Sequence, residues 1–308
     1  MLNKAKQSLQ IIRAIQEQYQ DFIHLGLAAY IVILVIFMLA NNISITPDRL
    51  VIFLLLGAVA TGRVFSFLKN WAPFVLLLLS YEALRGFAWN IGLERVHASD
   101  IIEFEKTVLG NIYTVPLQAA LYQPGQVAWY DVAAAIFYFL HFAFPFAFAF
   151  WFWLKDLSRY WGYVTRLLVL SYAGWITYVI FPAMPPWLAS QNQLLPPVHK
   201  IITETLDKLL INFNISQVYL AITPNPIAAV PSLHAAYAWL AMLFTFQFFK
   251  KSVGIFFIGY SVVLWFLLIY TGEHYLVDLI LGAVYATITH LVVGRLLAPR
   301  LHRFRTIV

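Results

Sequence analysis

The chain has 308 residues, of which 62% are hydrophobic and 11% are charged, whereas a soluble domain usually carries about 25% charged residues. The lack of cysteine excludes disulfides, thiol catalysis and thiolate metal sites. The formal charge of +6 does not indicate nucleic acid, because the Lys and Arg residues are spread over short segments between apolar blocks. The composition predicts an integral membrane protein with helical spans, because a bilayer offers no partner to bare backbone groups.

The N-terminal residues 1–21 are polar and amphipathic, and the first apolar block begins near Phe22, so we expect a cytoplasmic segment without a cleavable signal. Apolar blocks of about 20 residues, enough to cross a bilayer, follow along the chain. They predict an all-α, polytopic membrane bundle of about eight transmembrane helices, at residues 22–41, 50–67, 72–90, 128–153, 161–182, 232–249, 253–271 and 274–296. We expect N-terminal spans and an outer loop over 22–127, a catalytic core over 128–297, and a basic cytoplasmic tail over 298–308.

The distribution of Lys and Arg predicts the orientation of these spans. If the N-terminus is cytoplasmic, eleven Lys and Arg residues fall on the inner side and five on the outer side. Short cytoplasmic loops carry the excess of positive charge. We therefore expect both termini to be cytoplasmic.

Two longer segments, 91–127 and 183–231, fall on the outer side in this topology and are expected to cap that face. Within the second, residues 195–213 read LPPVHKIITETLDKLLINF and place their apolar residues along one helical face. This pattern predicts either a helix lying in the membrane interface or a lid helix packed on the bundle.

Ionisable residues at the ends of spans are the first candidates for function, because charge inside a membrane is costly. A proline-broken loop over 224–231 leads into a span that starts with Ser232 and His234, where the backbone N–H groups of a helix N-terminus attract anions. His274 and Asp278 are four residues apart, so the carboxylate can reach the imidazole. In the predicted topology both stretches lie at the same membrane face, where they can converge on a phosphate-sized anion.

The motifs PSLH at 231–234 and GEHYLVDLILG at 272–282 resemble signature motifs of the type-2 phosphatidic acid phosphatase superfamily. The chain is most similar to the branch that contains fungal inositol phosphorylceramide synthase, through FPAMPPW at 181–187, AVPSLHAAYAWL and YTGEHYLVDLILG in the same order. The resemblance covers roughly residues 128–297 and implies a six-helix phosphatase-like core.

The resemblance also implies roles for individual residues. It makes His274 the nucleophile that forms a phosphohistidine, Asp278 the residue that orients it, and His234 the acid that protonates the leaving group. Ser232 would help to hold the phosphate. It implies no metal ion and no cofactor.

The chain departs from the superfamily where phosphate-binding cations are expected. The stretch 176–187 has neither Lys nor Arg, and Leu268 stands where an Arg usually precedes the catalytic His by six residues. A phosphodiester carries less charge than a monoester, so the missing cations favour transfer of a phospho-head group, such as inositol phosphate, from a phospholipid to a lipid alcohol. Hydrolysis of a lipid phosphate or polyprenyl pyrophosphate remains the alternative within this reaction class.

Three further residues are candidates at this site. Arg85 is the best remaining cation, although it could simply pair with Glu82 three residues earlier. His141 could contact a head group or the catalytic carboxylate, although an interhelical hydrogen bond is the simpler interpretation. Glu273 could contact a polar acceptor or face water.

Two other classes of protein remain open at this stage. A transporter could use the His and Asp residues as a proton path, although such a path does not require Ser-x-His and His-x3-Asp at facing helix starts. An inactive scaffold could keep the fold, although the full set of catalytic residues argues against it. The expected partners are lipid substrates, a lipid alcohol or water as acceptor, and the bilayer, with the active site on the extracytoplasmic side.

Overall fold

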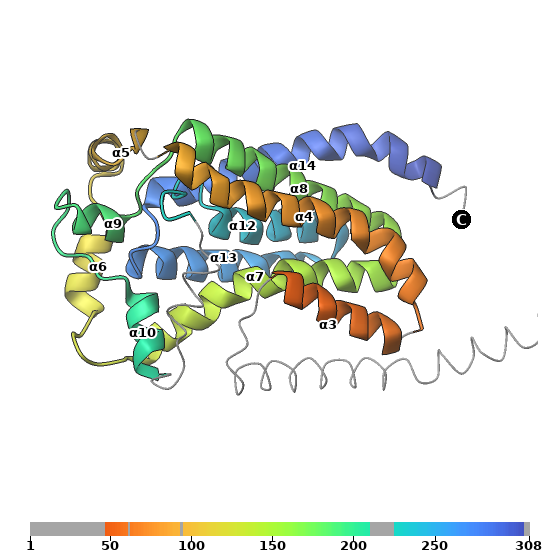
Figure 1. Cartoon of the computed structure of the whole chain (residues 1–308), viewed down its shortest axis with the longest axis horizontal. Helices are drawn as coiled ribbons and strands as arrows, with labels where there is room; N and C mark the ends of the chain where they lie inside the picture. The colour runs from red at the N-terminus through yellow and green to blue at the C-terminus, as the bar shows by residue number, and fades with distance from the viewer. Residues whose placement is uncertain (1–46, 61, 93–94, 210–224, 305–308) are drawn as a thin grey trace, which may run out of the picture. The chain divides into compact units, whose positions relative to one another are not determined.

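The computed structural model describes residues 47–60, 62–92, 95–209 and 225–304 (Figure 1). The described residues form helices joined by loops, with two isolated β-bridges, as the all-α prediction required. The chain divides into two compact units, Met1–Ala72 and Pro73–Val308. The predicted N-terminal segment 1–21 and the predicted span 22–41 lie outside the described residues.

The first unit contains α3 (Pro47–Ala60) and the beginning of α4 (Val64–Gly92). The predicted single span over 50–67 is wrong in its bounds, because the helix stops at Ala60 and a new one begins at Val64. Gly62 lies between them with φ +66°, a conformation that glycine adopts without steric cost. Early in α4, the rings of Phe67 and Trp71 stack with centroids 5.0 Å apart.

The second unit contains the rest of α4 and five other helices that correspond to predicted spans. Four of them begin and end within four residues of the predicted span: α7 (Trp129–Lys155), α8 (Leu157–Ile180), α12 (Leu233–Phe248) and α13 (Lys251–Tyr270). The fifth, α14 (Leu276–Phe304), begins close to its predicted span over 274–296 but continues beyond its end. Asp156 ends α7 and caps α8, where its carboxylate accepts from the backbone N–H of Ser158 and Arg159. A short Asx cap of this kind is a common helix start.

Length and hydropathy make the chain a multi-pass integral membrane protein. Four of the described helical stretches are long and apolar enough to cross a bilayer: Val64–Gly86, Leu157–Ile180, Lys251–Tyr270 and Leu276–Leu296. α7 adds a fifth if its two halves form one span bent by 45° between His141 and Ala143. Pro145 lies within α7 and explains the bend, because its ring clashes with the carbonyl four residues earlier.

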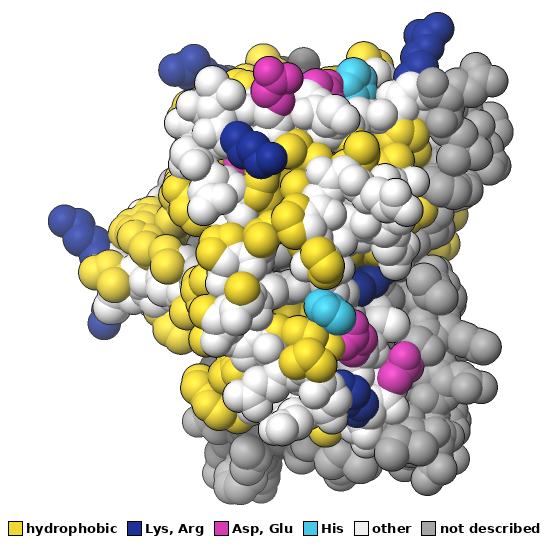
Figure 2. Space-filling model, turned by 90° about the vertical axis from the view of Figure 1, so that its left-hand side faces the viewer, with side chains coloured by type: hydrophobic (Ala, Val, Ile, Leu, Met, Phe, Trp, Pro, Cys, Tyr) yellow, Lys and Arg dark blue, Asp and Glu magenta, His cyan; other side chains and the backbone are white. Residues whose placement is uncertain are grey.

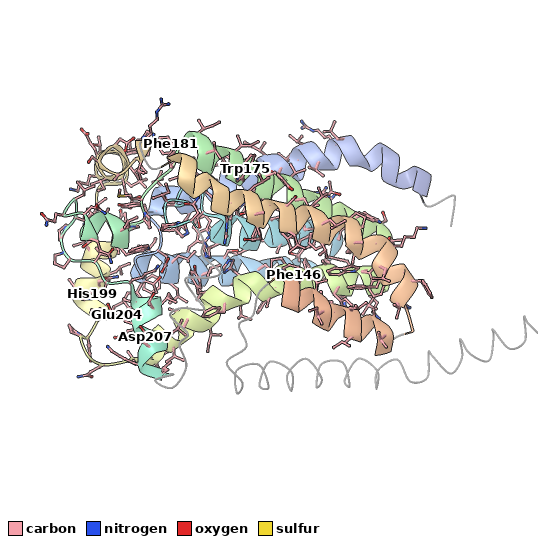
Figure 3. All side chains as sticks on the ribbon, viewed as in Figure 1. Phe146, Trp175, Phe181, His199, Glu204 and Asp207 are labelled. Carbon is pink, nitrogen blue, oxygen red and sulfur yellow. The ribbon has the colours of Figure 1, made fainter. Side chains whose placement is uncertain are left out.

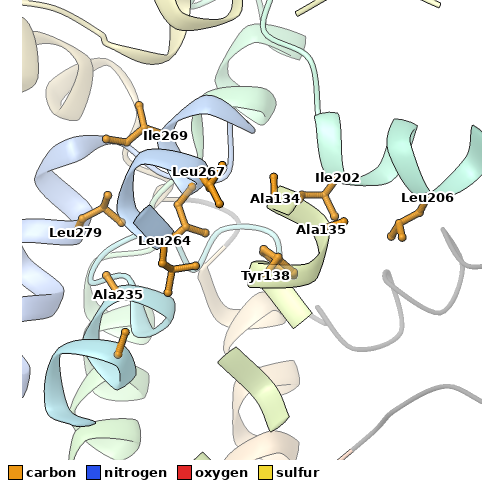
Figure 4. Packing of buried hydrophobic residues seen from close by; sticks show 12 residues of the cluster. Ala134, Ala135, Tyr138, Ile202, Leu206, Ala235, Leu264, Leu267, Ile269 and Leu279 are labelled. Carbon is orange, nitrogen blue, oxygen red and sulfur yellow. The ribbon is translucent and has the colours of Figure 1, made fainter. Parts of the chain in front are cut away.

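The core of the second unit is arranged around α12, which packs against α7, α8, α13 and α14. Apolar side chains from α7, α13 and α14 surround its first turns in one buried cluster (Figure 4). Leu268 is 1% exposed and belongs to this cluster. The position where the superfamily usually has Arg is therefore packed into apolar surroundings.

Short helices cover the end of the second unit where α12 and α14 begin (Figure 1). These are α5 (Ser99–Phe104), the π-helix η2 (Glu105–Leu109), α6 (Thr114–Leu121), α9 (Pro186–Gln191) and α10 (Ile201–Leu209). Figure 2 looks onto this end and shows apolar surface between scattered charged and His side chains. The short helices of the two segments predicted to form a cap therefore lie over this end.

α10 packs on the bundle, as the second of the two predictions for this segment required. Ile201, Ile202 and Leu206 are buried, and the helix packs on α7. Its start is fixed by a polar cluster in which His199 Nδ1 lies 3.0 Å from a carboxylate oxygen of Glu204 (Figure 3). The hydroxyl of Tyr122 donates to the same carboxylate.

Candidate active site

The loop before α12 is held in place by backbone pairing with the segment after α8. The N–H of Ala183 donates to the carbonyl of Ile227 at 2.8 Å, and the N–H of Ala229 donates to the carbonyl of Ala183 at 3.2 Å. Tyr178 of α8 donates its hydroxyl to the carbonyl of Pro231 at 2.9 Å. FPAMPPW and PSLH, two motifs far apart in sequence, therefore lie side by side.

Ser232 is the N-cap of α12 and brings His234 into the first turn of that helix. Its Oγ accepts from the backbone N–H of Ala235 at 3.3 Å, the usual bond of an N-cap serine. Its own N–H donates to the backbone carbonyl of Asp278 at 3.0 Å. Ser232 is fully buried and links the starts of α12 and α14 directly.

The turn between α13 and α14 carries the second motif. Gly272 has φ +79°, and a Cβ there would lie 2.9 Å from the carbonyl oxygen of His199, so the turn requires glycine. Gln118 of α6 closes over it, donating to the carbonyls of His199 and Tyr270 at 2.9 and 2.8 Å. The backbone N–H of His274 then donates to the carbonyl of Leu268 at 3.3 Å.

The three predicted catalytic residues lie in one chain of contacts. His274 Nδ1 is 3.2 Å from Asp278 Oδ2, and its Nε2 is 3.1 Å from His234 Nδ1. An N–H at Nδ1 donating to the carboxylate leaves a lone pair on Nε2, which accepts from His234. His274 and Asp278 are 4% and 0% exposed, so the pair is shielded from bulk water.

A glycine sets the spacing between the two helices that carry these residues. A Cβ built on Gly282 of α14 would lie 2.4 Å from the carbonyl oxygen of Ser232 and 3.4 Å from the N of Ala236. The first of these separations is far below van der Waals contact. Gly282 therefore allows α14 to approach the start of α12 closely enough for His274 to meet His234.

His141 of α7 lies beside His234. Its Nδ1 bonds to the carbonyl of Tyr138 in its own helix, and its ring centroid lies 3.9 Å from that of His234. The Tyr138 ring is 4.7 Å from the same imidazole. Ring packing against His234 is therefore one contact that His141 makes across helices.

Arg85 forms the predicted pair with Glu82 and also belongs to the surroundings of the site. Its guanidinium lies 3.3 Å from the Glu82 carboxylate. It is also close enough to His141 and His234 for its charge to act on both rings. Pairing with Glu82 and proximity to the site therefore occur together.

Glu105 is a site residue that the sequence did not reveal. It starts η2, is 1% exposed, and accepts from the backbone N–H of Leu276 at 3.2 Å and of Val277 at 2.9 Å. Burial raises the pKa of Glu105 to about 7, against the lowering effect of these two hydrogen bonds. No motif distinguishes this Glu from its exposed neighbour Glu103.

Lys200 is a second cation near the active site, from the loop before α10. Its Nζ lies 4.0 Å from the ring centroid of Trp187, whose backbone N–H donates to the carbonyl of Gly272 at 3.1 Å. The Glu273 carboxylate, next to His274, acts on Lys200 electrostatically, and burial lowers the pKa of the lysine. Glu273 is itself 8% exposed, so it does not simply face water.

Comparison with known proteins agrees with the predicted resemblance. The profile of the PAP2 superfamily, which comprises the type-2 phosphatidic acid phosphatases, matches residues 99–292. This range is more than half of the chain and contains His234, His274 and Asp278, but not Arg85. A curated relative from Bacteroides thetaiotaomicron, named phosphoinositol dihydroceramide synthase, is 26% identical over 222 residues, covering 68% of this chain and 71% of the relative.

No solved structure matches the chain. The family profile extends beyond the two signature motifs and includes the short helices α5, η2 and α6. The resemblance inferred from PSLH and GEHYLVDLILG, including its relation to the inositol phosphorylceramide synthase branch, is confirmed. This multi-pass membrane protein therefore belongs to the PAP2 superfamily.

Proposed function

We propose that the protein is a lipid phosphotransferase that moves a phospho-head group from a phospholipid to a lipid alcohol through a phosphohistidine at His274. The observation that carries the proposal is the position of His274 between Asp278 and His234, at 3.2 and 3.1 Å. The name of the bacterial relative, a phosphoinositol dihydroceramide synthase, favours inositol phosphate as the head group and a ceramide-type lipid as the acceptor.

The chemistry follows from the two faces of the His274 ring. Asp278 holds the N–H at Nδ1, so the lone pair of Nε2 attacks phosphorus and the bond from phosphorus to the diacylglycerol oxygen breaks. His234, in its imidazolium form, gives its Nδ1 proton to the leaving oxygen and becomes a neutral imidazole. To do so, the substrate phosphate must replace the direct contact between the two imidazoles.

The second half of the reaction reverses these roles. The acceptor hydroxyl attacks phosphorus, His234 takes up its proton, and the bond from phosphorus to Nε2 breaks. In this proposal Ser232 and the start of α12 hold the nonbridging oxygens, because N–H groups at a helix start stabilise developing negative charge. Arg85 and Lys200 are the candidate cations, and His141 and Glu273 the candidate head-group contacts.

The proposed topology has eight spans, with six core helices, both termini in the cytoplasm and the active site at the extracytoplasmic face. It rests on the excess of eleven Lys and Arg residues over five. The domain limits proposed from sequence, with a core over 128–297, go with it. Accessibility labelling of single cysteines placed in the cysteine-free chain would test this orientation.

A panel of phospholipids and lipid alcohols, incubated with the purified protein and followed by mass spectrometry of the products, tests the proposed reaction. With phosphatidylinositol labelled in the inositol ring, the wild type should carry an acid-labile label, and His274→Gln should carry none. His290→Gln, a change of another histidine on α14, serves as the matched control and should label normally. Rapid cleavage of phosphatidic acid without any head-group transfer would refute the transferase and leave the phosphatase.

A further inference from the structure

The first turn of α14 is clamped by a carboxylate from a distant part of the chain. Glu105 accepts two backbone N–H bonds, one on each oxygen, from the consecutive residues Leu276 and Val277. These residues begin α14, and Asp278, the orienting partner of His274, is the next one. The clamp therefore acts directly on the turn that carries the catalytic carboxylate.

The N–H groups at this helix start are taken up by acidic side chains. Asp278 Oδ2 accepts from the N–H of Tyr275 at 2.9 Å, and Glu105 accepts from the next two. A helix leaves its first N–H groups without partners inside the helix, and their dipoles favour negative charge. Two carboxylates fill this role at α14, so the phosphate must be held elsewhere, and the start of α12 lies next to it, where the Ser232 N–H donates to the carbonyl of Asp278.

Apolar packing holds Glu105 in this position. Ile101 and Ile102 of α5, directly before η2, are buried in one cluster with Tyr275, and Val277 packs against the same cluster. The contact of α5 and η2 with the first turn of α14 thus combines apolar packing with the hydrogen bonds of Glu105. A carboxylate buried to this degree is positioned more sharply than an exposed one, because both of its oxygens are committed to fixed donors.

We propose that Glu105 is a positioning residue of the phosphotransfer site, which fixes the first turn of α14 so that Asp278 and His274 keep their alignment with His234. The inference rests on the function proposed above. It also assigns a second role, because a negative charge next to Asp278 favours the positively charged imidazole that forms when His274 Nε2 bonds to phosphorus.

The charge state of Glu105 provides a test that a purely structural role would not pass. Burial raises the pKa of Glu105 to about 7, and the groups that face it are Asp278 and Tyr275, with the His274 ring beyond Asp278. Only the ionised form offers full acceptor capacity on both oxygens. The clamp should therefore be complete above pH 7 and should weaken as the pH falls below it.

Three variants of the full-length protein, purified in detergent, test the proposal with inositol-labelled phosphatidylinositol as donor and a short-chain ceramide as acceptor. Glu105→Gln removes the charge and one of the two acceptors, and Glu105→Asp keeps the charge but shortens its reach. Glu103→Gln is the matched control, because Glu103 is exposed and lies two residues away. The readouts are kcat, KM, the rate of His274 labelling, and thermal unfolding, each between pH 6 and 8.5.

Glu105→Gln should lower kcat and the labelling rate about 10- to 100-fold, in line with the loss expected from a small misplacement of reacting groups, with KM within about threefold. The fall of wild-type kcat below pH 7 should disappear in Glu105→Gln and persist in Glu105→Asp. Unfolding at pH 8 should not occur at a lower temperature in Glu105→Gln, because the variant removes a buried charge.

Two results would overturn the inference. One is a Glu105→Gln variant with wild-type kcat and an unchanged pH profile. The other is a loss of activity in Glu105→Gln and Glu105→Asp that simply parallels a loss of thermal stability at every pH. If the wild type itself neither labels nor transfers, the proposed function fails, and the inference fails with it.

Discussion

Gly282→Ala should uncouple catalysis from stability, because it adds a single methyl group where α14 passes the start of α12. That Cβ would lie 2.4 Å from the carbonyl oxygen of Ser232, whereas nonbonded heavy atoms in contact lie about 3.5 Å or more apart. The obstructing atom belongs to the backbone, so no side chain can rotate away. The helices must separate by about 1 Å, the difference between these two distances.

The separation should affect the reaction more than the fold. Overpacking costs about 1–3 kcal/mol of stability, and replacing a helical glycine by alanine returns up to about 1 kcal/mol, so most of the protein should remain folded. A shift of about 1 Å between His234 and His274 should lower the rate about 100-fold, or about 2.7 kcal/mol in the barrier. Head-group transfer and His274 labelling measure the rate, and thermal unfolding measures the stability.

Gly259→Ala is the control for this prediction. Gly259 also lies within a long helix, α13, but a Cβ there would meet nothing within 4 Å. The variant should keep wild-type activity and gain slightly in stability through helix propensity. Wild-type transfer by Gly282→Ala would refute the reasoning, because it would mean that the distance between α12 and α14 does not control the site.

Three further predictions concern charged groups. Burial raises the pKa of Glu105 from 4.5 to about 7, so Glu105 binds its proton more tightly in the folded state than in the unfolded state. The stability of the wild type should therefore fall relative to that of Glu105→Gln as the pH rises from 4.5 to about 7. Parallel curves of unfolding temperature against pH for the two proteins would contradict this. Lys200→Ala should raise KM for an anionic lipid donor about tenfold with little change in kcat, whereas Lys208→Ala on α10 should not, and equal KM values would remove Lys200 from the site. Arg85→Gln should lower kcat/KM about 100-fold and Glu82→Gln less than about threefold; equal losses would assign Arg85 to its ion pair alone.

The sequence predicted the long helices well because their signal is continuous. An apolar block of span length has few alternatives in a membrane, and α7, α8, α12 and α13 follow the predicted spans within a few residues. α14 begins as predicted and runs on past the predicted end. The failure at 50–67 has the same origin. The hydropathy of the sequence gives no sign of a break at Gly62. The backbone there has φ +66°, however, so an α-helix cannot continue through this residue.

The proximity of His234, His274 and Asp278 could be predicted because it is partly local. His274 and Asp278 are a helical i, i+4 pair, and Ser232 and His234 start a helix, so spacing alone gives their directions. Glu105 could not be found in this way. Its hydrogen-bond partners are more than 170 positions away in the sequence. Only the tertiary packing shows that Glu105, and not Glu103, contacts them.

Cations were the weakest part of the prediction. In the sequence, Lys200 is simply a charged residue in a loop. Nothing in the adjacent sequence indicates that this loop folds back onto Trp187 and Gly272. The pairing of Arg85 with Glu82 was visible as an i, i+3 spacing. Its proximity to His141 and His234 was not, because that depends on how α4 packs.

In the proposed reaction, the shortness of α12 would affect which acceptor the site can use. α12 has 16 residues and its antiparallel neighbour α13 has 20, so α12 is about 24 Å long against about 30 Å. The two are joined by a tight turn at Phe249 and Lys250, so His234 lies about 6 Å, roughly one helical turn, below the far end of α13. The reacting phosphorus would then lie below the level at which the bundle meets water. Few water molecules would reach it, so a lipid hydroxyl arriving from within the membrane would have little competition from water as the acceptor. Acceptor choice would then depend on solvent exclusion as much as on direct contacts with the acceptor.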